Sequence, residues 1–519
     1  MTPTKKIFIN VVATYGRSLY ALALGLITAR WALQALGKVD YGLSGLVGGL
    51  AAMVTFLNGL LSYAVSRFYA VSVGAGLKDG NAENAIDECR RWFNAALLIH
   101  SVVPTILLLV GYPLGIWMVE HFLSIPPDRV YACVWVWRYT CLSCFIGMIS
   151  VPFNAMYGAK QDIAELTIYS IVTTTLNAFF LYYMITHPGD WLSRFAGWTC
   201  FIAVTPLLIQ MVRAFYKYPE CRYVRKYLWD PERLGQIAKF GTARFWTMFS
   251  ALICGQGDSI LVNKFLGPVY NGSVNIGNSV ASHASTLSLS ISGAFWPAIA
   301  NLAGAGEKDK VDAMVFRLCR IGSLLILVFA IPLVIEIDPI LILWLKDPPP
   351  SVAPLCVVAI ADSVLERMSE GLYMPIMAFG KGVGRYSWVI GWAGFTRLAV
   401  ALTLFLSGVG IVAVCASIII GRIVVVIVRL RLSRELAGLS VWKWINTVLY
   451  PISLLAAATY GVGCLCRFLS PSIVRIVLTT VVCEMIFLPL AYFIILNAAE
   501  RGWIQEKVCL FTKRLGFKR

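Results

Sequence analysis

Residues 92–118 read WFNAALLIHSVVPTILLLVGYPLGIWM, a run in which no side chain carries a full charge at neutral pH. An α-helix needs about 20 predominantly apolar residues to cross the hydrocarbon core of a bilayer. Blocks of similar length recur along the chain, bounded by charged residues, Gly or Pro. They are too long for strands and do not alternate as a half-buried sheet would. The stretch therefore predicts a transmembrane helix, and its recurrence predicts an all-α polytopic membrane protein.

The composition of the whole chain agrees with this interpretation. Hydrophobic residues make up 59% of the 519 positions and charged residues only 14%, against about 25% charged residues in an ordinary soluble domain. A soluble enzyme of this composition could not keep its surface hydrated. We expect about 14 transmembrane helices, at residues 8–34, 42–70, 92–118, 131–157, 164–187, 192–213, 240–264, 273–302, 312–336, 353–379, 387–408, 410–429, 446–467 and 474–497.

The formal net charge of +17 indicates how these helices are oriented. Basic residues concentrate in the cytoplasmic loops of membrane proteins. Most Lys and Arg outside the predicted spans fall on one side of the membrane if the N-terminus is cytoplasmic. We therefore predict that both termini are cytoplasmic (N-in, C-in). This distribution explains the charge without a nucleic-acid partner.

Two loop motifs occur twice, at an offset of 230 residues. LGxVxxG at 36–42 recurs at 266–272, and GAGxKD at 74–79 recurs at 304–309. An apolar composition does not explain polar loop motifs that match in register. Six spans separate the copies, an even number, so both copies have the same orientation. The parallel repeat predicts two six-helix lobes related about the membrane normal, with a cavity between them that suits alternating access.

We divide the chain accordingly. The predicted parts are an N-terminal six-helix lobe, a basic cytoplasmic linker at the inner membrane surface, a C-terminal six-helix lobe, and two additional helices with a basic tail. Their boundaries are 1–213, 214–239, 240–430 and 431–519.

Arginines inside the spans are the candidate substrate ligands. A charge at the centre of a membrane costs about 2.5–3.5 kcal/mol or more, so it needs a partner or a water-filled cavity. Polar residues fall on one helical face in the first span (Asn10, Thr14, Arg17, Thr28) and in the seventh (Arg244, Thr247, Cys254, Asp258). Guanidinium groups offer a planar fork to phosphate oxygens. We expect Arg17 and Arg244, with Arg138 from the outer half of the fourth span, to bind a phosphate-bearing substrate in a central cavity.

Acids inside the spans are candidates for coupling transport to Na⁺ or H⁺: Asp258, Asp362, Glu366, Glu370 and Glu484. Three of them follow at successive i+4 steps of the tenth span, where like charges repel unless they are protonated, paired or hydrated. The alternative is structural ion pairing of these acids with Arg367 and Arg397, because a short hairpin brings Arg397 to the depth of the last two. Both interpretations stay open at this point.

Small polar residues in the eighth span, among them Asn278 and Ser282, lie on or near one helical face. Such residues permit close helix packing, and hydroxyls and amides that face a cavity would bind sugar. Both can hold on opposite faces of the same helix.

Several kinds of chemistry lack their usual residues. The chain has no P-loop motif, so ATP is not the direct source of energy. Its 14 Cys fall almost wholly inside apolar segments and have no partners at metal-ligand spacing. No predicted outer loop is long enough to hold a catalytic cluster of His, Asp or Arg. We therefore expect no enzyme activity, no metal site and no cofactor other than a coupling ion.

Several motifs carry a resemblance to a known family: TAR at 28–30, LGxxDYG at 36–42, GG at 48–49 and SRF at 66–68. Together they resemble the polysaccharide flippases of the multidrug/oligosaccharidyl-lipid/polysaccharide (MOP) exporter superfamily. VPFNA at 151–155, followed by Ala159, is similar to the Pro-x-Asn-Ala signature of Wzx-type O-antigen and capsule repeat-unit flippases. The resemblance is specific over the first 165 residues and afterwards rests on span count and two-lobed order.

This resemblance implies two six-helix bundles around a V-shaped cationic cavity, with two further helices. It implies that undecaprenyl-diphosphate-linked oligosaccharide is flipped from the cytoplasmic to the periplasmic leaflet of a bacterial inner membrane, for lipopolysaccharide or other surface polysaccharide. A polysaccharide polymerase and a chain-length regulator are the expected protein partners. The alternatives are a cation-coupled multidrug or small-molecule antiporter of the same superfamily, which would have 12 spans and an acidic cavity, and a polytopic sugar-transfer enzyme.

Overall fold

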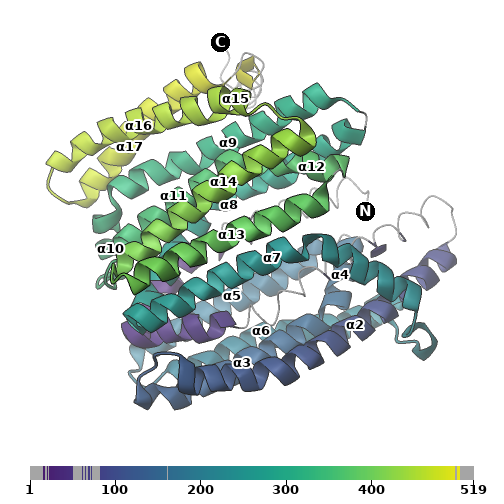
Figure 1. Cartoon of the computed structure of the whole chain (residues 1–519). Helices are drawn as coiled ribbons and strands as arrows, with labels where there is room; N and C mark the ends of the chain where they lie inside the picture. Colours follow the sequence, from purple (N-terminus) through teal and green to yellow (C-terminus); the bar gives the residue numbers. More distant parts are fainter. Residues whose placement is uncertain are drawn as a thin grey trace, which may run out of the picture. The chain divides into compact units, whose positions relative to one another are not determined.

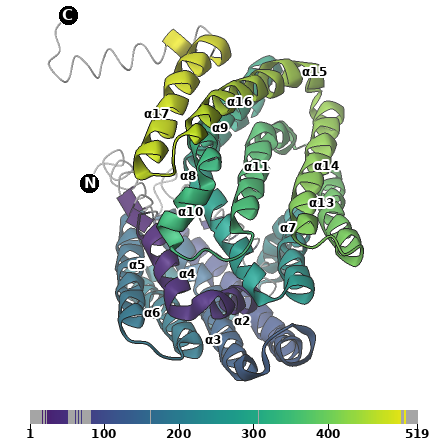
Figure 2. The ribbon, with the colours of Figure 1, turned by 90° about the vertical axis from the view of Figure 1, so that its left-hand side faces the viewer.

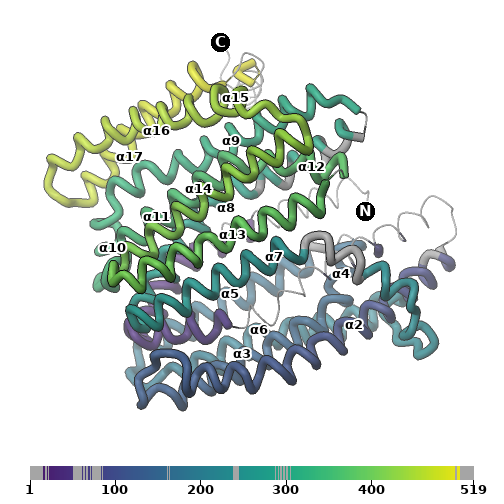
Figure 3. Tube along the Cα trace, in the orientation of Figure 1, coloured from purple at the N-terminus to yellow at the C-terminus, as the bar shows by residue number. Residues whose placement is uncertain are grey.

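Helices account for nearly all of the residues that can be described in a computed structural model of the chain (Figure 3). The described residues are 16–17, 20–21, 23–50, 61, 65, 68–69, 72, 82–160, 162–304, 306–380, 382–496 and 500–502. No strand occurs among them. The predicted all-α class is therefore confirmed.

The elements follow one another as helices joined by short turns (Figure 1). Residues 23–50 are helical and precede the labelled elements. The labelled helices are α2 (Ala82–Trp117), α3 (Val130–Ile149), α4 (Val151–Ala159), α5 (Ile163–Thr186), α6 (Leu192–Lys217), α7 (Pro231–Leu266), α8 (Pro268–Gly304), α9 (Lys308–Ile335), α10 (Ile337–Leu345), α11 (Val352–Glu370), α12 (Met374–Phe379), α13 (Val383–Leu406), α14 (Ile411–Ala437), α15 (Val441–Trp444), α16 (Tyr450–Gly463) and α17 (Ile473–Leu490). Single turns of 3₁₀- or π-helix are η1 (Met118–Phe122), η2 (Pro127–Arg129), η3 (Pro219–Cys221), η4 (Arg225–Tyr227), η5 (Gly371–Tyr373), η6 (Ile445–Leu449), η7 (Cys464–Phe468) and η8 (Ala491–Ile495).

Ten helical stretches among the described residues are long and apolar enough to cross a membrane. They are Ile86–Phe122, Pro127–Ile149, Ala164–Thr186, Leu192–Lys217, Phe245–Leu266, Lys308–Ile335, Val383–Leu406, Ile411–Ala437, Val441–Phe468 and Ile473–Ile495. Each coincides with a predicted span. Of the other four predicted spans, 8–34 and 42–70 lie partly outside the described residues, and 273–302 and 353–379 correspond to α8 and to α11 with α12. The polytopic architecture is confirmed, and the count of 14 stays a prediction.

Residues 92–118 form most of α2, and their side chains show which parts of this helix face other helices and which face the outside of the bundle. Phe93 and Ala96 are buried against neighbouring helices, whereas Ile106, Leu109 and Val110 are all more than half exposed. A run of large exposed apolar side chains would be an aggregation liability in water. In a bilayer the same side chains contact lipid chains.

The chain divides into two compact units. One comprises Met1–Ile276, Pro349–Ser351 and Ser387–Ser417, and the other Gly277–Pro348, Val352–Tyr386 and Ile418–Arg519. Helices α8, α13 and α14 each continue from one unit into the other. The division into two six-helix lobes stays a prediction.

The predicted basic linker, residues 214–239, packs on other segments of the first unit. Asn94 accepts a hydrogen bond from the backbone N–H of Val224 (2.8 Å) and donates one to the carbonyl of Arg222 (3.1 Å). Asp230 then caps α7 by accepting a hydrogen bond from the backbone N–H of Arg233 (3.1 Å). Burial raises the pKa of Asp230, but the hydrogen bonds from Arg233 outweigh burial and lower the pKa from its usual value. The linker is an ordered part of this unit.

Helix α17, the last long helix of the second unit, packs on α9 and α16 (Figures 1 and 2). Ion pairs hold it near its start and beyond its end. Glu336, which follows α9, is fully buried and accepts hydrogen bonds from Arg475 (2.7 Å) and Thr479 (2.8 Å) of α17. Beyond the other end of α17, Glu500 accepts a hydrogen bond from Arg320 of α9 (2.8 Å). Helix α17 and the residues after it are thereby held to the part of α9 between Arg320 and its C-terminal end.

Removing one partner of the buried pair isolates a charge. Replacing Arg475 with Met leaves the carboxylate of Glu336 buried without its guanidinium. We expect the free energy of unfolding to fall by about 3–5 kcal/mol, seen as a lower midpoint of thermal unfolding in detergent. The double variant Glu336→Gln/Arg475→Met removes both charges and should recover most of the loss. Arg467→Met, at an exposed arginine, is the control. Equal losses in the single and double variants would contradict the ion-pair explanation.

Candidate functional site

The two copies of the LGxVxxG repeat meet within the first unit. The first glycine of each copy has a left-handed backbone, with φ of +75° at Gly37 and +91° at Gly267, a conformation that favours glycine. The last glycines touch each other. A Cβ at Gly42 would overlap the carbonyl oxygen of Pro268, and a Cβ at Gly272 would lie 3.7 Å from the Cα of Gly42. The repeat found in the sequence therefore marks two segments that are in direct contact.

Uncharged groups extend this contact along the adjoining helices. A Cβ at Gly45 would overlap the amide of Asn275. Three residues before the second copy of the repeat, Asn263 of α7 accepts a hydrogen bond from the backbone N–H of Ser124 (2.7 Å) and donates one to its carbonyl (3.2 Å). The segment that holds the second copy is thus fastened to the first third of the chain through glycines and amides.

Helix α7 packs on α13 through polar groups at one-turn spacing. Its side chains donate to α13 carbonyls from Thr247 to Ser387 (3.1 Å), from Ser250 to Gly391 (2.5 Å) and from Cys254 to Gly394 (3.2 Å), and Asp258 completes the row by pairing with Arg397. The two glycines let the helices approach closely enough for these bonds. Thr247, Cys254 and Asp258 therefore lie against another helix, which corrects the expectation that they share a cavity-facing surface with Arg244. Coupling of a cation by Asp258 stays a prediction.

In the second unit, acids of α11 are paired with arginines of α14. Arg422 donates to both carboxylate oxygens of Asp362 (2.7 and 2.8 Å) and also pairs with Glu366. Arg429 donates to Glu366 (3.1 Å) and to the hydroxyl of Ser369 (2.8 Å). Charge-assisted and bidentate contacts of this kind are the strong ones in a low dielectric.

The third acid of α11 is paired as well. Glu370 pairs with Arg367 one turn earlier and accepts a hydrogen bond from Ser292 of α8 (2.8 Å). Three acids and three arginines in this cluster cancel in charge. The predicted pairing of Arg367 is confirmed, whereas the prediction that Arg397 joins these acids is wrong. Arg397 pairs with Asp258 because α13 packs on α7.

The predicted residues of the first span are described only in part. Arg17 is half-buried, and no ion pair to it occurs within the described residues. The hydroxyl of Thr28 donates to the carbonyl of Leu24 (2.8 Å). Outside the described residues lie Asn10, Thr14 and the side chain of Arg244.

The other predicted residues are separate from the acid–arginine cluster. Asn278 and Ser282 are exposed and one turn apart on α8, so they share a face. Glu484 is half-buried on α17, without an ion pair in the part of the chain that the structure describes. Arg138 is exposed, and its guanidinium carbon lies 4.8 Å from the ring centroid of Trp135. Their roles in substrate binding and ion coupling stay predictions.

Sequence reasoning missed the two arginines of α14 that complete the cluster. A signal for them was present. Arg422 follows Asp362 by 60 residues and Arg429 follows Ser369 by 60, the constant offset expected of two parallel helices at equal depth. Glu336 and Arg475 had no such signal, because each is a single charge near the end of a span.

Comparisons with known proteins fit this geometry. The MatE family profile matches residues 245–404, less than half of the chain. Similar solved structures are the lipid II flippase MurJ in an inward closed conformation (TM-score 0.61, 13% identity, 93% of this chain and 98% of that one) and an inward-facing multidrug resistance MATE family transporter of the MOP superfamily (0.60, 14%, 81% and 94%). A third is a MOP superfamily transporter from Pyrococcus furiosus whose binding pocket is described as reversed in polarity (0.51, 15%, 83% and 93%). No curated protein sequence matches this chain.

The chain has the MATE- and MurJ-like transporter fold. The coverage of this chain is larger for MurJ than for the MATE transporter. At these identities the similarity establishes the fold alone, so the substrate has to be argued from the residues of this chain.

The glycine contact between the repeats can be tested with two alanine variants. At Gly42 a Cβ would overlap a backbone carbonyl, whereas at Gly48 a Cβ would have open space. We expect Gly42→Ala to lower the free energy of unfolding by about 1–3 kcal/mol, as overpacking does. Gly48→Ala, in the same helix, should raise it by about 0.5–1 kcal/mol. Thermal unfolding in detergent measures both, and equal effects would show that the contact contributes nothing.

Proposed function

We propose that this chain is a flippase that moves undecaprenyl-diphosphate-linked oligosaccharide from the cytoplasmic to the periplasmic leaflet of a bacterial inner membrane. The transporter fold and the motifs of the first 165 residues support this assignment. The observation that carries it is the charge balance inside the spans. Four of the five candidate coupling acids are paired with arginine, while Arg17 has no ion-pair partner among the described residues.

This balance favours an anionic substrate over a cationic one. An acid that binds and releases a coupling cation must be free of a permanent countercharge for part of the cycle. Asp362 and Glu366 are instead held by the guanidinium of Arg422. An arginine without a carboxylate partner offers its fork to phosphate oxygens. A diphosphate is the part of the substrate that such arginines would bind.

The two additional helices also favour a lipid-linked substrate. Helices α16 and α17 pack on α9 and on each other. Val474, Val477 and Met485 of α17 are more than half exposed, which gives this helix an apolar outer surface. A polyprenyl chain could lie along such a surface while the polar part of the substrate crosses the protein.

The proposed cycle assigns a task to each predicted group. Arg17 and Arg244 bind the diphosphate, and Asn278 and Ser282 donate hydrogen bonds to sugar hydroxyls. The glycan crosses through water by alternating access, with the prenyl chain in lipid. The product enters surface polysaccharide or lipopolysaccharide synthesis, where a polymerase and a chain-length regulator are the expected partners.

Substitution of Arg17 tests the proposed flippase function directly. In cells that depend on this chain, Arg17→Ala should stop complementation and make lipid-linked repeat units accumulate on the cytoplasmic leaflet, at an unchanged protein level. Arg17→Lys keeps the charge but loses the planar fork, so we expect partial function. Arg431→Ala, at an exposed arginine on α14, is the control. Normal surface glycan in the Arg17→Ala strain would remove this residue from the site.

Purified protein in liposomes separates the proposal from its rivals. We expect movement of a diphosphate-linked glycolipid without any new glycan product, and product formation would instead support a sugar-transfer enzyme. A cation-coupled multidrug antiporter is favoured by the MatE match at 245–404. It would export cationic drugs at the expense of a Na⁺ or H⁺ gradient.

The neutral double variant Asp258→Asn/Arg397→Gln tests whether Asp258 couples transport to a cation. Because the two charges cancel, removing both should leave glycolipid movement and its ion dependence unchanged. Asp258→Asn alone isolates the guanidinium of Arg397 and should lower the midpoint of thermal unfolding. Loss of ion dependence in the folded double variant would identify Asp258 as a coupling residue and contradict our assignment.

A further inference from the structure

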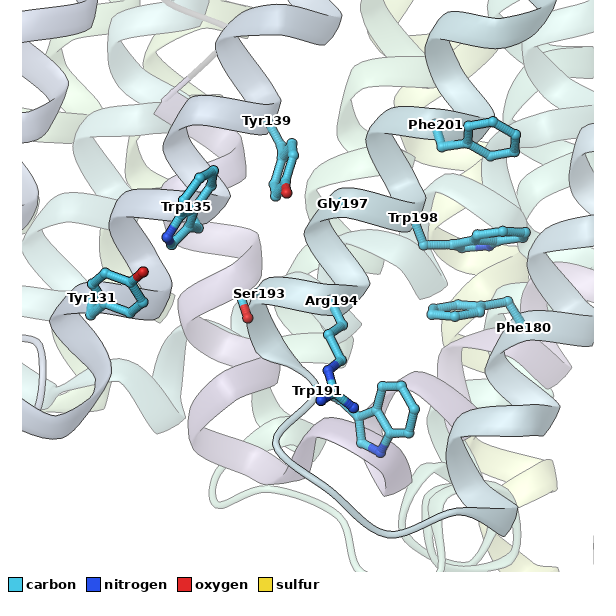
Figure 4. A pocket seen from close by; sticks show the side chains of 10 residues that line it. All are labelled: Tyr131, Trp135, Tyr139, Phe180, Trp191, Ser193, Arg194, Gly197, Trp198 and Phe201. Carbon is cyan, nitrogen blue, oxygen red and sulfur yellow. The ribbon is translucent and has the colours of Figure 1, made fainter.

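A groove of about 690 Å³ in the first unit crosses α6, with side chains of α3 on one side and of α5 and α6 on the other (Figure 4). Aromatic side chains of α3 form one wall: Tyr131, Trp135 and Tyr139, spaced one turn apart. Phe180 of α5 stacks on Trp198 of α6 in the opposite wall, with 4.5 Å between the ring centroids. Aromatic side chains of this kind give an open groove rigid sides.

The floor of the groove owes its depth to a glycine. Gly197 of α6 lies between the two walls in Figure 4, with Ser193 and Arg194 one turn before it. A Cβ at Gly197 would lie 3.3 Å from the ring of Tyr139, tighter than an ordinary contact. Any other residue at this position would fill the space between the walls.

Two guanidinium groups are associated with the aromatic residues of the groove. The guanidinium of Arg138 lies 4.8 Å from the ring centroid of Trp135, and that of Arg194 lies 5.5 Å from the ring centroid of Trp191. Both arginines are exposed, and no carboxylate lies within ion-pair distance of either among the described residues. The rings fix the guanidinium groups by cation–π contact but do not neutralise them.

The groove opens on the outer surface of the helices, where lipid would contact it. Tyr131 is 74% exposed and Phe201 54% exposed at its edges, and Leu142 continues the same face of α3 at 49%. In the predicted orientation α3 and α6 both begin at the outer side. The groove then lies at the level of the outer-leaflet headgroups, with apolar side chains extending toward the membrane centre.

Anchoring of the protein at the membrane interface would explain the Trp and Tyr residues of the groove but not its arginines. Trp and Tyr are enriched at both membrane surfaces, so the aromatic residues alone would need no ligand. Arginine is disfavoured at the outer side, where the predicted loops of this chain carry few basic residues. Two unneutralised guanidinium groups beside an open groove therefore call for an anion.

We propose that this groove binds the phosphate of an anionic phospholipid in the outer leaflet. Arg194, which lines the groove, holds the phosphate, and Arg138, which contacts the wall residue Trp135, adds a second positive charge at its edge. The headgroup occupies the space above Gly197, and the acyl chains run along the face that includes Leu142 and Phe201. Guanidinium groups recognise phosphate oxygens by charge-assisted hydrogen bonds. The site is separate from the proposed transport site, because it includes neither Arg17 nor Arg244, and it assigns Arg138 to the lipid and not to the transported diphosphate.

Lipid binding to the purified full-length chain tests this inference without any transport step. Protein stripped of lipid in detergent is titrated with phosphatidylglycerol or with phosphatidylcholine, and the bound fraction is measured by native mass spectrometry. We expect phosphatidylglycerol to bind about tenfold more tightly. Arg138→Gln and Arg194→Gln should each reduce that preference at least about fivefold. Gly197→Leu keeps both arginines but fills the groove, and should weaken binding to a similar degree.

Arg467→Gln is the matched control, since Arg467 is exposed on η7 and does not line the groove. It should leave the preference unchanged, and the thermal unfolding midpoint of each variant shows that it is folded. Equal binding of the two lipids, or an equal effect of Arg467→Gln, would overturn the proposal. Inorganic phosphate that binds as tightly as phosphatidylglycerol would show that the groove takes free phosphate, which would also overturn it.

Discussion

A charge inside hydrocarbon has to be matched by an opposite charge, and much of the buried structure of this chain follows from that constraint. Helix α11 carries acids that α14 neutralises, α7 carries an acid that α13 neutralises, and the end of α9 is joined to α17 in the same way. Each pair joins helices that are distant in the sequence. The charged residues of the spans therefore act first as fasteners between helices, and only those left without a partner are available to a substrate.

The sequence predicts the helices better than their partners. Apolar blocks of membrane-spanning length give the positions of ten helices, because the bilayer imposes that length on any helix that crosses it. The repeat at 36–42 and 266–272 also has a structural counterpart in the contact of its glycines. The partner of Arg397 could not be read in the same way. Several acids lie at the same predicted membrane depth as Arg397, so depth alone does not identify its partner. The close packing of α13 on α7 at Gly391 and Gly394 places Arg397 beside Asp258.

The candidate sites, too, depend on helix contacts that the sequence alone does not predict. An aromatic stripe on α3 can be read from its spacing, but the meaning of Gly197 depends on the helix that lies opposite it. Arg138 could be predicted as a functional cation from its cost in a membrane. Which way it faces depends on how α3 packs on α6, and that information lies in contacts between segments far apart in the chain.

The meeting of Gly42 and Gly272 has a mechanical consequence. Two bare backbones hold no charge to be desolvated and no side chain that must change rotamer. Parting them loses only dispersion contacts, about 0.1–0.2 kcal/mol for each atom pair. Separating an arginine from its carboxylate inside the membrane would require several kcal/mol. The contact of the two glycines is therefore electrically neutral, and separating the glycines would break no ion pair between the helices.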